Sequence, residues 1–144
     1  MKKLFILCLF LINSPLWAEN LTIFPPYTIH HNAFTTDFLS PEIARSYHIK
    51  RSKNQAMINI SIIKNQSKEN IGTAVTANVK VIAKNLLGQL TTLEIREIKE
   101  ADAVYYIADF PVSHRALLRF DIQVQAEKKG QYLNTRLQQE FFTD

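Results

Sequence analysis

Alternation of apolar and polar residues with a period of two dominates the chain from residue 55 onwards. A strand places successive side chains on opposite faces, so this pattern predicts strands with one buried and one wet face. No segment after residue 54 keeps the 3.6-residue period of a helix. The clearest run lies between residues 118 and 125, where every second residue is apolar: Leu118, Phe120, Ile122 and Val124.

The alternation and the turn residues between the runs predict seven strands. The expected ranges are 27–35, 55–64, 74–83, 90–98, 104–110, 118–125 and 132–142. Seven short strands with one buried face each, separated by turns, are typical of an antiparallel β-sandwich of immunoglobulin-like type. The sequence therefore predicts an all-β fold, with the order of the strands left open.

One short helix is expected near residues 40–48. Ser40 is a favourable N-cap, Pro41 suits the first helical position, and Glu42 lies in the first turn. Its expected buried stripe is Ile43, Ala44 and Tyr47.

The first eighteen residues have the pattern of a secretory signal peptide. Lys2 and Lys3 precede an apolar run over residues 4–12, and Ala18 is a small residue before a polar start. The apolar run is far shorter than the ~20 residues of a membrane-spanning helix. We therefore expect cleavage near Ala18, a single domain over residues 19–144, and a periplasmic or secreted location.

Removal of that leader changes the chemistry available to the chain. Loss of Lys2 and Lys3 lowers the net charge from +4 to +2, so nucleic acid is not an expected partner. Cys8, the single cysteine, leaves with the leader. The remaining domain is then expected to have no disulfide, no thiol nucleophile and no thiolate metal ligand.

The sequence supplies no motif for catalysis or for a cofactor. His30 and His31 are adjacent in an expected strand and should face opposite sides, while His48 and His114 stand alone, so no metal site is predicted. A Gly-x-Ser-x-Gly elbow and a glycine-rich phosphate loop are both absent. We assign no catalytic residue and expect no cofactor.

Residues 34–53 form the most unusual stretch because they combine aromatic side chains with a basic run. Four cations fall within positions 45–53. One interpretation is a partner- or anion-binding surface. The other, which we favour, is that the helix closes one open end of the sandwich, with its aromatics in the core and its cations on a wet rim. The candidate binding residues are Arg45, Tyr47, His48, Lys50, Arg51 and Lys53.

A second candidate surface follows from the strand over residues 104–110 and the loop after it. Tyr105 and Tyr106 lie in that strand, and His114 and Arg115 in the loop. Tyrosines beside a cationic loop suit partner recognition. The alternative is that one of two adjacent strand tyrosines packs in the core while the other keeps its hydroxyl in water.

Several stretches resemble a known family. The matching segments are 27–34, 38–53, 85–89, 96–98, 103–111 and 139–142, of which 38–53 is the most specific. The chain thereby resembles small exported bacterial proteins classed as a domain of unknown function, number 4426. The resemblance implies an exported domain of this size and a sandwich. It brings no established activity, cofactor or catalytic residue.

Three functional hypotheses follow. The leading one is a non-enzymatic binding or accessory module of the cell envelope, whose partner is an envelope protein that adds a strand or docks on the helix. The second is a small hydrolase or isomerase, which requires a pocket holding at least two of His31, Glu42, His48 and Arg51. The third is a purely structural or stress-related envelope protein without a pocket. The oligomeric state is not predicted.

Overall fold

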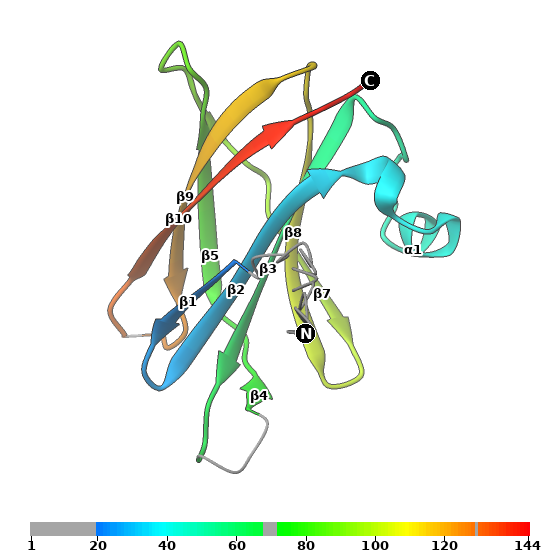
Figure 1. The fold of residues 1–144 in the computed structure, drawn as a ribbon. Helices are drawn as coiled ribbons and strands as arrows, with labels where there is room; N and C mark the ends of the chain where they lie inside the picture. The colour runs from blue at the N-terminus through cyan, green and yellow to red at the C-terminus, as the bar shows by residue number, and fades with distance from the viewer. Residues whose placement is uncertain (1–19, 68–71, 129) are drawn as a thin grey trace, which may run out of the picture.

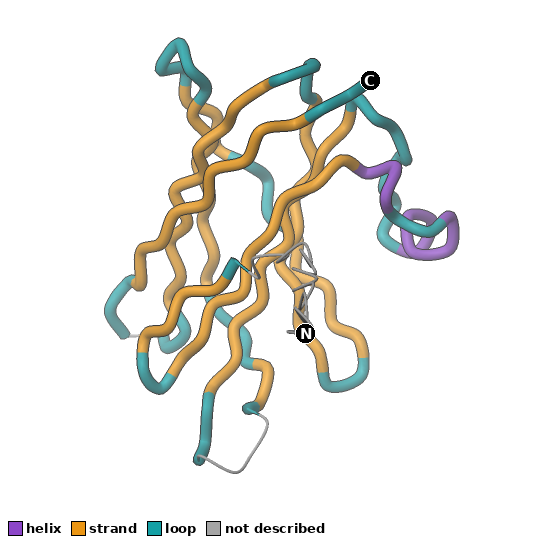
Figure 2. The backbone as a smooth tube through the Cα atoms, in the orientation of Figure 1, coloured by secondary structure: helices purple, strands orange, loops and turns teal. Residues whose placement is uncertain are grey.

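The computed structural model describes residues 20–67, 72–128 and 130–144. Within these residues ten antiparallel strands form two sheets that face each other (Figures 1 and 2). The predicted leader, residues 1–18, lies outside them. The strands are β1 (Leu21–Phe24), β2 (Tyr27–Thr35), β3 (Gln55–Lys64), β4 (Thr73–Ala74), β5 (Asn78–Lys84), β6 (Leu90–Thr92), β7 (Arg96–Glu100), β8 (Ala103–Pro111), β9 (Ala116–Gln125) and β10 (Leu133–Phe141).

The larger sheet has the order β1-β2-β3-β8-β7, with β4 paired to the end of β3. The smaller sheet has the order β10-β9-β5-β6. Both sheets are antiparallel throughout. The structure therefore confirms the predicted all-β sandwich.

The core lies between the sheets and is built by the alternation seen in the sequence. Every second residue of β3 and β9 points inward, because side chains alternate across a strand. Phe110 of β8 packs its ring 5.5 Å from that of Phe120 and 6.0 Å from that of Phe141, which ties the two sheets together. The largest fully buried side chains of β3 and β9 are Ile58, Ile60, Ile62, Phe120, Ile122 and Val124.

The prediction of seven strands is too low, chiefly because two predicted strands change sheet partway along. The run over 74–83 is divided into β4, in the larger sheet, and β5, in the smaller one. The run over 90–98 is divided in the same way into β6 and β7. The apolar alternation continues through both crossings because the chain stays at the sandwich interior. It therefore hides the change of partner.

The first strand, β1, was not predicted. It pairs with the start of β2 in a hairpin whose two-residue turn is Pro25 and Pro26. Proline fits such a position because it needs no backbone donor there. β1 begins at Leu21, opposite His30, and the N–H of His31 donates to the carbonyl of the preceding residue, Asn20, over 2.9 Å.

The predicted helix is confirmed as α1 (Pro41–Ser46), which follows a 3-10 turn, η1 (Thr36–Phe38). The N–H of Ile43 donates to the hydroxyl of Ser40, as expected of an N-cap. The predicted buried stripe is only partly right: Ala44 is buried and Tyr47 half-buried, whereas Ile43 is 45% exposed. A helix of six residues makes too few turns to bury a whole stripe.

Residues 36–54 cover part of the outer face of the larger sheet rather than closing an end of the sandwich. A second apolar cluster forms there, built on the outward side chains Met57 of β3 and Ile107 of β8 together with Ile49 of the covering segment. Leu39 and Tyr47 pack against the same cluster. The favoured expectation of an end cap is therefore corrected to a cover on one face.

None of the helices in the described part of the chain is long and apolar enough to cross a membrane.

Candidate functional site

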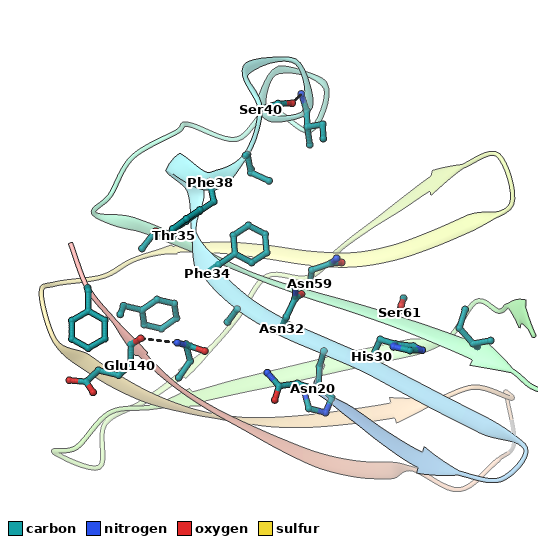
Figure 3. Close-up of a pocket in the computed structure, with 18 residues that line it drawn as sticks. Asn20, His30, Asn32, Phe34, Thr35, Phe38, Ser40, Asn59, Ser61 and Glu140 are labelled. Atoms are coloured by element: carbon teal, nitrogen blue, oxygen red, sulfur yellow. Dashed lines mark hydrogen bonds between the residues drawn. The ribbon is translucent and has the colours of Figure 1, made fainter. Parts of the chain in front are cut away.

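A groove runs along the outer face and free edge of β2, and we call it the β2 groove. It has a volume of about 1140 Å³ and lies between β2, the segment η1–α1 and the end of β10 (Figure 3). The strand β2 lines the groove with residues from both of its faces, because successive side chains of a strand alternate between the faces. His30, Asn32 and Phe34 lie on the outer face, while His31 and Ala33 line the groove from the inner side of the edge.

The walls of the groove are apolar and partly exposed. Phe38 is 77% exposed and Phe142 is 59% exposed. These side chains come from segments more than a hundred residues apart in sequence and line the same groove because β10 ends beside β2. Large apolar side chains gathered around one hollow mark a binding surface more often than isolated ones do. The apolar lining comprises Ala33, Phe34, Phe38, Leu39, Ile43, Ile63, Phe141 and Phe142.

The floor of the groove is polar and mostly uncharged. Asn32 and Asn59 are register partners on β2 and β3, and their side chains lie side by side in Figure 3. His30 and Ser61 form the next such pair along the strands. Glu140 is the one acidic side chain in the lining that is described. The arrangement suits a ligand that is largely apolar and carries uncharged hydrogen-bonding groups.

His31 is held at the edge of the groove by a chain of hydroxyl groups. Its Nε2 lies 3.1 Å from Oγ1 of Thr22, which lies 2.6 Å from Oγ1 of Thr135 on β10. Burial, followed by the nearby His30, lowers the pKa of His31. This environment therefore favours the neutral form of the imidazole. Its Nδ1 is buried with no hydrogen-bond partner among the described residues, as is Oδ1 of Asn59.

Within the described residues, part of the backbone edge of β2 is unpaired in the groove. The N–H of His31 points towards β1, so the N–H and C=O of Ala33, two positions on, point the same way. β1 does not extend that far. Ala33 has no backbone partner on this side within the described residues. Backbone groups this close to the interior normally have a partner, which makes this edge a place for another strand.

The segment after β2 is fastened by two side chains. The hydroxyl of the buried Thr36 donates to the carbonyl of Lys50 over 2.7 Å and accepts from the N–H of Ser52 over 2.9 Å. Arg51 donates from Nε to the carbonyl of Leu39 over 2.7 Å and from Nη2 to that of Asp37 over 3.0 Å. Arg51, one of the candidate binding residues, thus spans the two ends of the covering segment.

None of the candidate binding residues over 45–53, Arg51 included, lines the β2 groove. Arg45, Lys50 and Lys53 are exposed, and so is His48, which has a positive φ of 55°. Tyr47 is half-buried, and its carbonyl accepts from Nη1 of Arg96 on β7 over 2.8 Å.

Tyr47 has a packing role, because its side chain lies against the second apolar cluster. Burial, followed by its hydrogen bond to Glu100, raises its pKa to about 12. The set of candidate residues over 45–53 is therefore spread around the cover rather than gathered at one point.

The second candidate surface is not assembled either. Tyr106 faces the core, where its hydroxyl donates to Oε2 of Glu97 over 2.8 Å and accepts from the N–H of Ala77 over 2.7 Å. Tyr105 faces the opposite side and packs in the cluster beneath the cover. His114 and Arg115 follow the far end of β8, where His114 contacts Asp144 and Arg115 contacts Glu140.

The residues required by the enzyme hypothesis do not meet in the β2 groove. His31 lines it, whereas Glu42, His48 and Arg51 do not. Among the described residues no group of three or more His, Cys, Asp or Glu side chains is placed to hold a metal ion.

Sequence reasoning drew attention to Phe34 and Phe38 but did not predict the groove. The aromatic content of residues 34–53 was the available signal. Nothing in the sequence indicated that Phe141 and Phe142, at the end of β10 in the other sheet, would line the same groove.

The comparisons with known proteins agree with the fold. The model of the family DUF4426, a domain of unknown function, matches residues 22–144. The crystal structure of a DUF4426 family protein from Pseudomonas aeruginosa PAO1 is 34% identical, with a TM-score of 0.73, over 88% of this chain and 96% of that one. No curated protein matches the chain.

More distant structures share the fold alone. FetP of uropathogenic Escherichia coli strain F11, expressed recombinantly in the periplasm, is 7% identical over 85% of this chain and 93% of that one, with a TM-score of 0.59. A copper-bound variant of FetP is 8% identical over 86% and 95%, with a TM-score of 0.61.

Proposed function

The chain belongs to the DUF4426 family, and we propose that it is an exported binding module that captures an extended apolar segment of an envelope protein in the β2 groove. The observation that carries this proposal is the backbone edge at Ala33, which no described residue pairs, set in a groove whose walls are apolar. Strand addition needs both features: main-chain bonds supply affinity and side-chain pockets supply specificity.

The expected export rests on the leader pattern of residues 1–18. The recombinant expression of FetP in the periplasm is compatible with a fold of this kind in that compartment. We infer that the functional form is a single domain over residues 19–144, in which no helix of the described part could span a membrane.

The sheet order supports an immunoglobulin-like topology as part of the proposal. The strands β2-β3-β8-β7 correspond to A-B-E-D of such domains, and β10-β9-β5-β6 corresponds to G-F-C-C′. β1 and β4 are then additions at the edges of the A-B-E-D sheet. In this scheme the β2 groove lies at strand A, an edge position that a partner strand can reach.

An incoming strand would lie in line with β1 and pair with Ala33. Its alternate side chains would then point to the walls formed by Phe34, Phe38 and Phe142, and towards the interior near His31. Nδ1 of His31 and Oδ1 of Asn59, which have no partner among the described residues, would be available to the ligand's polar groups. The uncharged floor favours an apolar or neutral segment over a charged one.

The alternatives have less support. The enzyme hypothesis requires two of its four residues in one pocket, and the β2 groove holds His31 alone of them. The purely structural hypothesis predicts no pocket, whereas a groove of about 1140 Å³ is present. The copper of the FetP variant is not carried over to this chain, because a likeness at 8% identity concerns the fold alone.

Site-specific photo-crosslinking in living cells tests the proposal. A photoreactive phenylalanine analogue replaces Phe38, which is 77% exposed in the groove, or Tyr132, which is 51% exposed and lies outside it. We expect the first position to crosslink one envelope protein through an extended apolar stretch, and the second position not to do so. The proposal would be contradicted by equal crosslinking at both positions, or by crosslinked products that contain no second protein.

A matched pair of variants tests the site. Ile43→Glu places a charge in the groove, and Ile23→Glu places one on β1 outside it; both isoleucines are exposed. We expect Ile43→Glu alone to abolish crosslinking, with the melting temperatures of both variants unchanged. Amide exchange at Ala33 should slow in the complex. Unchanged exchange would show that the ligand binds without adding a strand.

A further inference from the structure

The turn between β5 and β6 presents two leucines to solvent at one end of the sandwich, the end at which the chain also terminates (Figure 1). Leu86 is 78% exposed and Leu87 is 84% exposed, and Leu90 at the start of β6 is 65% exposed. We propose that this hairpin tip docks on an anionic lipid surface, with the two leucines inserted among the acyl chains. The proposal does not depend on the β2 groove, to which none of these residues contributes.

The leucines are held outward by a turn that is itself well built. Oδ1 of Asn85 accepts from the N–H groups of Leu87 and Gln89 over 3.0 and 2.9 Å, and its Nδ2 donates to Oε1 of Gln89 over 2.7 Å. Gly88 adopts a φ of 81°, which a glycine reaches without strain. Folding has therefore already ordered the tip, and insertion into a membrane requires no further ordering of its backbone.

Two cations lie directly behind the tip. Lys84 and Arg119 are register partners on β5 and β9, and Lys84 is paired on its other side with Leu90. Both cations are exposed and neither forms an ion pair with a described residue. Residues 85–92 contain no acidic side chain. Long basic side chains beside inserted apolar ones match the charge of anionic headgroups.

A lipid surface fits this tip better than a protein does. A stable protein interface uses about 20–30 residues a side. The tip offers three exposed leucines and two cations on one narrow hairpin. A membrane interface needs no complementary shape and can accept a few apolar side chains together with nearby basic ones. Weak, reversible attachment of this kind would hold the module at a membrane while leaving the opposite parts of the sandwich free.

Sedimentation with lipid vesicles tests the inference. The protein is isolated from the periplasm of expressing cells, with its processed form defined by mass spectrometry. Vesicles contain equal parts of phosphatidylglycerol and phosphatidylethanolamine, or phosphatidylcholine alone. We expect co-sedimentation with the first kind, weakening as salt rises. Failure to bind either kind, or equal binding to both, would overturn the proposal.

The variants locate the contact. Replacing both Leu86 and Leu87 by Gln should weaken vesicle binding roughly tenfold or more. The control Ile23→Gln removes an aliphatic side chain of comparable exposure, 62%, from β1 and should bind as the unmodified protein does. Equal loss of vesicle binding in both variants would overturn the proposal. The proposal would also fail if the double variant at Leu86 and Leu87 still bound vesicles but no longer captured a protein partner.

A tryptophan at the tip supplies a second readout. In Leu87→Trp the emission should shift to the blue when anionic vesicles are added, because the indole leaves water. A variant that sediments with vesicles but shows no shift would place the membrane contact elsewhere on the molecule and overturn the assignment to this hairpin.

Discussion

Thr22 of β1 and Thr135 of β10 join the free edges of the two sheets through a hydrogen bond of 2.6 Å between their hydroxyl oxygens. The same hydroxyl of Thr22 lies 3.1 Å from Nε2 of His31. The link therefore closes the sandwich beside the β2 groove and fixes the imidazole that lines it. The fastened edge lies next to the stretch of β2 at Ala33, which has no backbone partner on this side among the described residues.

Thr135→Val should lower the free energy of unfolding by about 1 kcal/mol, because the near-isosteric change removes one hydroxyl from a half-buried pair. Urea unfolding at neutral pH measures the loss. Thr135→Ser keeps the hydroxyl and is the control, expected to lose clearly less. If the serine variant is as unstable as the valine variant, the bond between the sheet edges contributes nothing.

Tyr106→Phe should lower the free energy of unfolding by about 1–2 kcal/mol, because the buried hydroxyl makes two hydrogen bonds. The backbone N–H of Ala77, at the point where the chain crosses between sheets, would lose its acceptor. Tyr105→Phe is the matched control in the neighbouring position, and a smaller loss is expected there. Equal losses would mean that packing, not the hydroxyl, sets the effect.

The stability of the protein should fall as the pH rises from about 10 to about 12. Burial raises the pKa of both Tyr47 and Tyr106 to about 12 in the folded state, above the ordinary value of 10.0. The unfolded chain therefore releases these protons first, and alkali favours unfolding in that window. Urea midpoints measured across the window should fall less steeply in Tyr106→Phe. A parallel fall in both proteins would contradict the shift at Tyr106.

The alternation of residues such as Phe120 and Ile122 predicted the strands and the sandwich because burial on one face is a local signal. The same signal continued through Val75 and Ala77, where the chain leaves the larger sheet for the smaller one. Alternation reports which face of a strand is buried. It does not report which strand lies beside it, and so the sheet changes were missed.

The candidate site shows the same limit. The distinctive composition of residues 34–53 marked a segment that does border the β2 groove, through Phe34, Phe38 and Ile43. The cations that drew most attention lie outside the groove. The remaining wall comes from Phe141 and Phe142, which the sequence predicted only as the end of a strand. Their meeting with β2 depends on how the two sheets stack, which no local pattern encodes.

Arg51 and Lys53 should separate the structural from the binding interpretation of the basic run. Arg51 donates to the carbonyls of Leu39 and Asp37. The side chain of Lys53, by contrast, makes no hydrogen bond or ion pair with any described residue. Arg51→Gln should lower the free energy of unfolding by about 1 kcal/mol, because the covering segment loses its fastening. Lys53→Gln should leave stability unchanged, since substitutions at exposed, unpaired positions rarely matter.

Thermal and urea unfolding of both variants, together with crosslinking from position 38, decide the matter. A fastening role for Arg51 predicts that Arg51→Gln weakens crosslinking only as far as it loosens η1 and Phe38, and that Lys53→Gln crosslinks normally. A charged binding surface predicts the reverse: both variants keep their stability and both lose the partner. That result would move the binding site from the β2 groove to the basic rim of the cover. Lys53 does not line the groove, so its replacement could abolish crosslinking only if Lys53 itself contacts the partner.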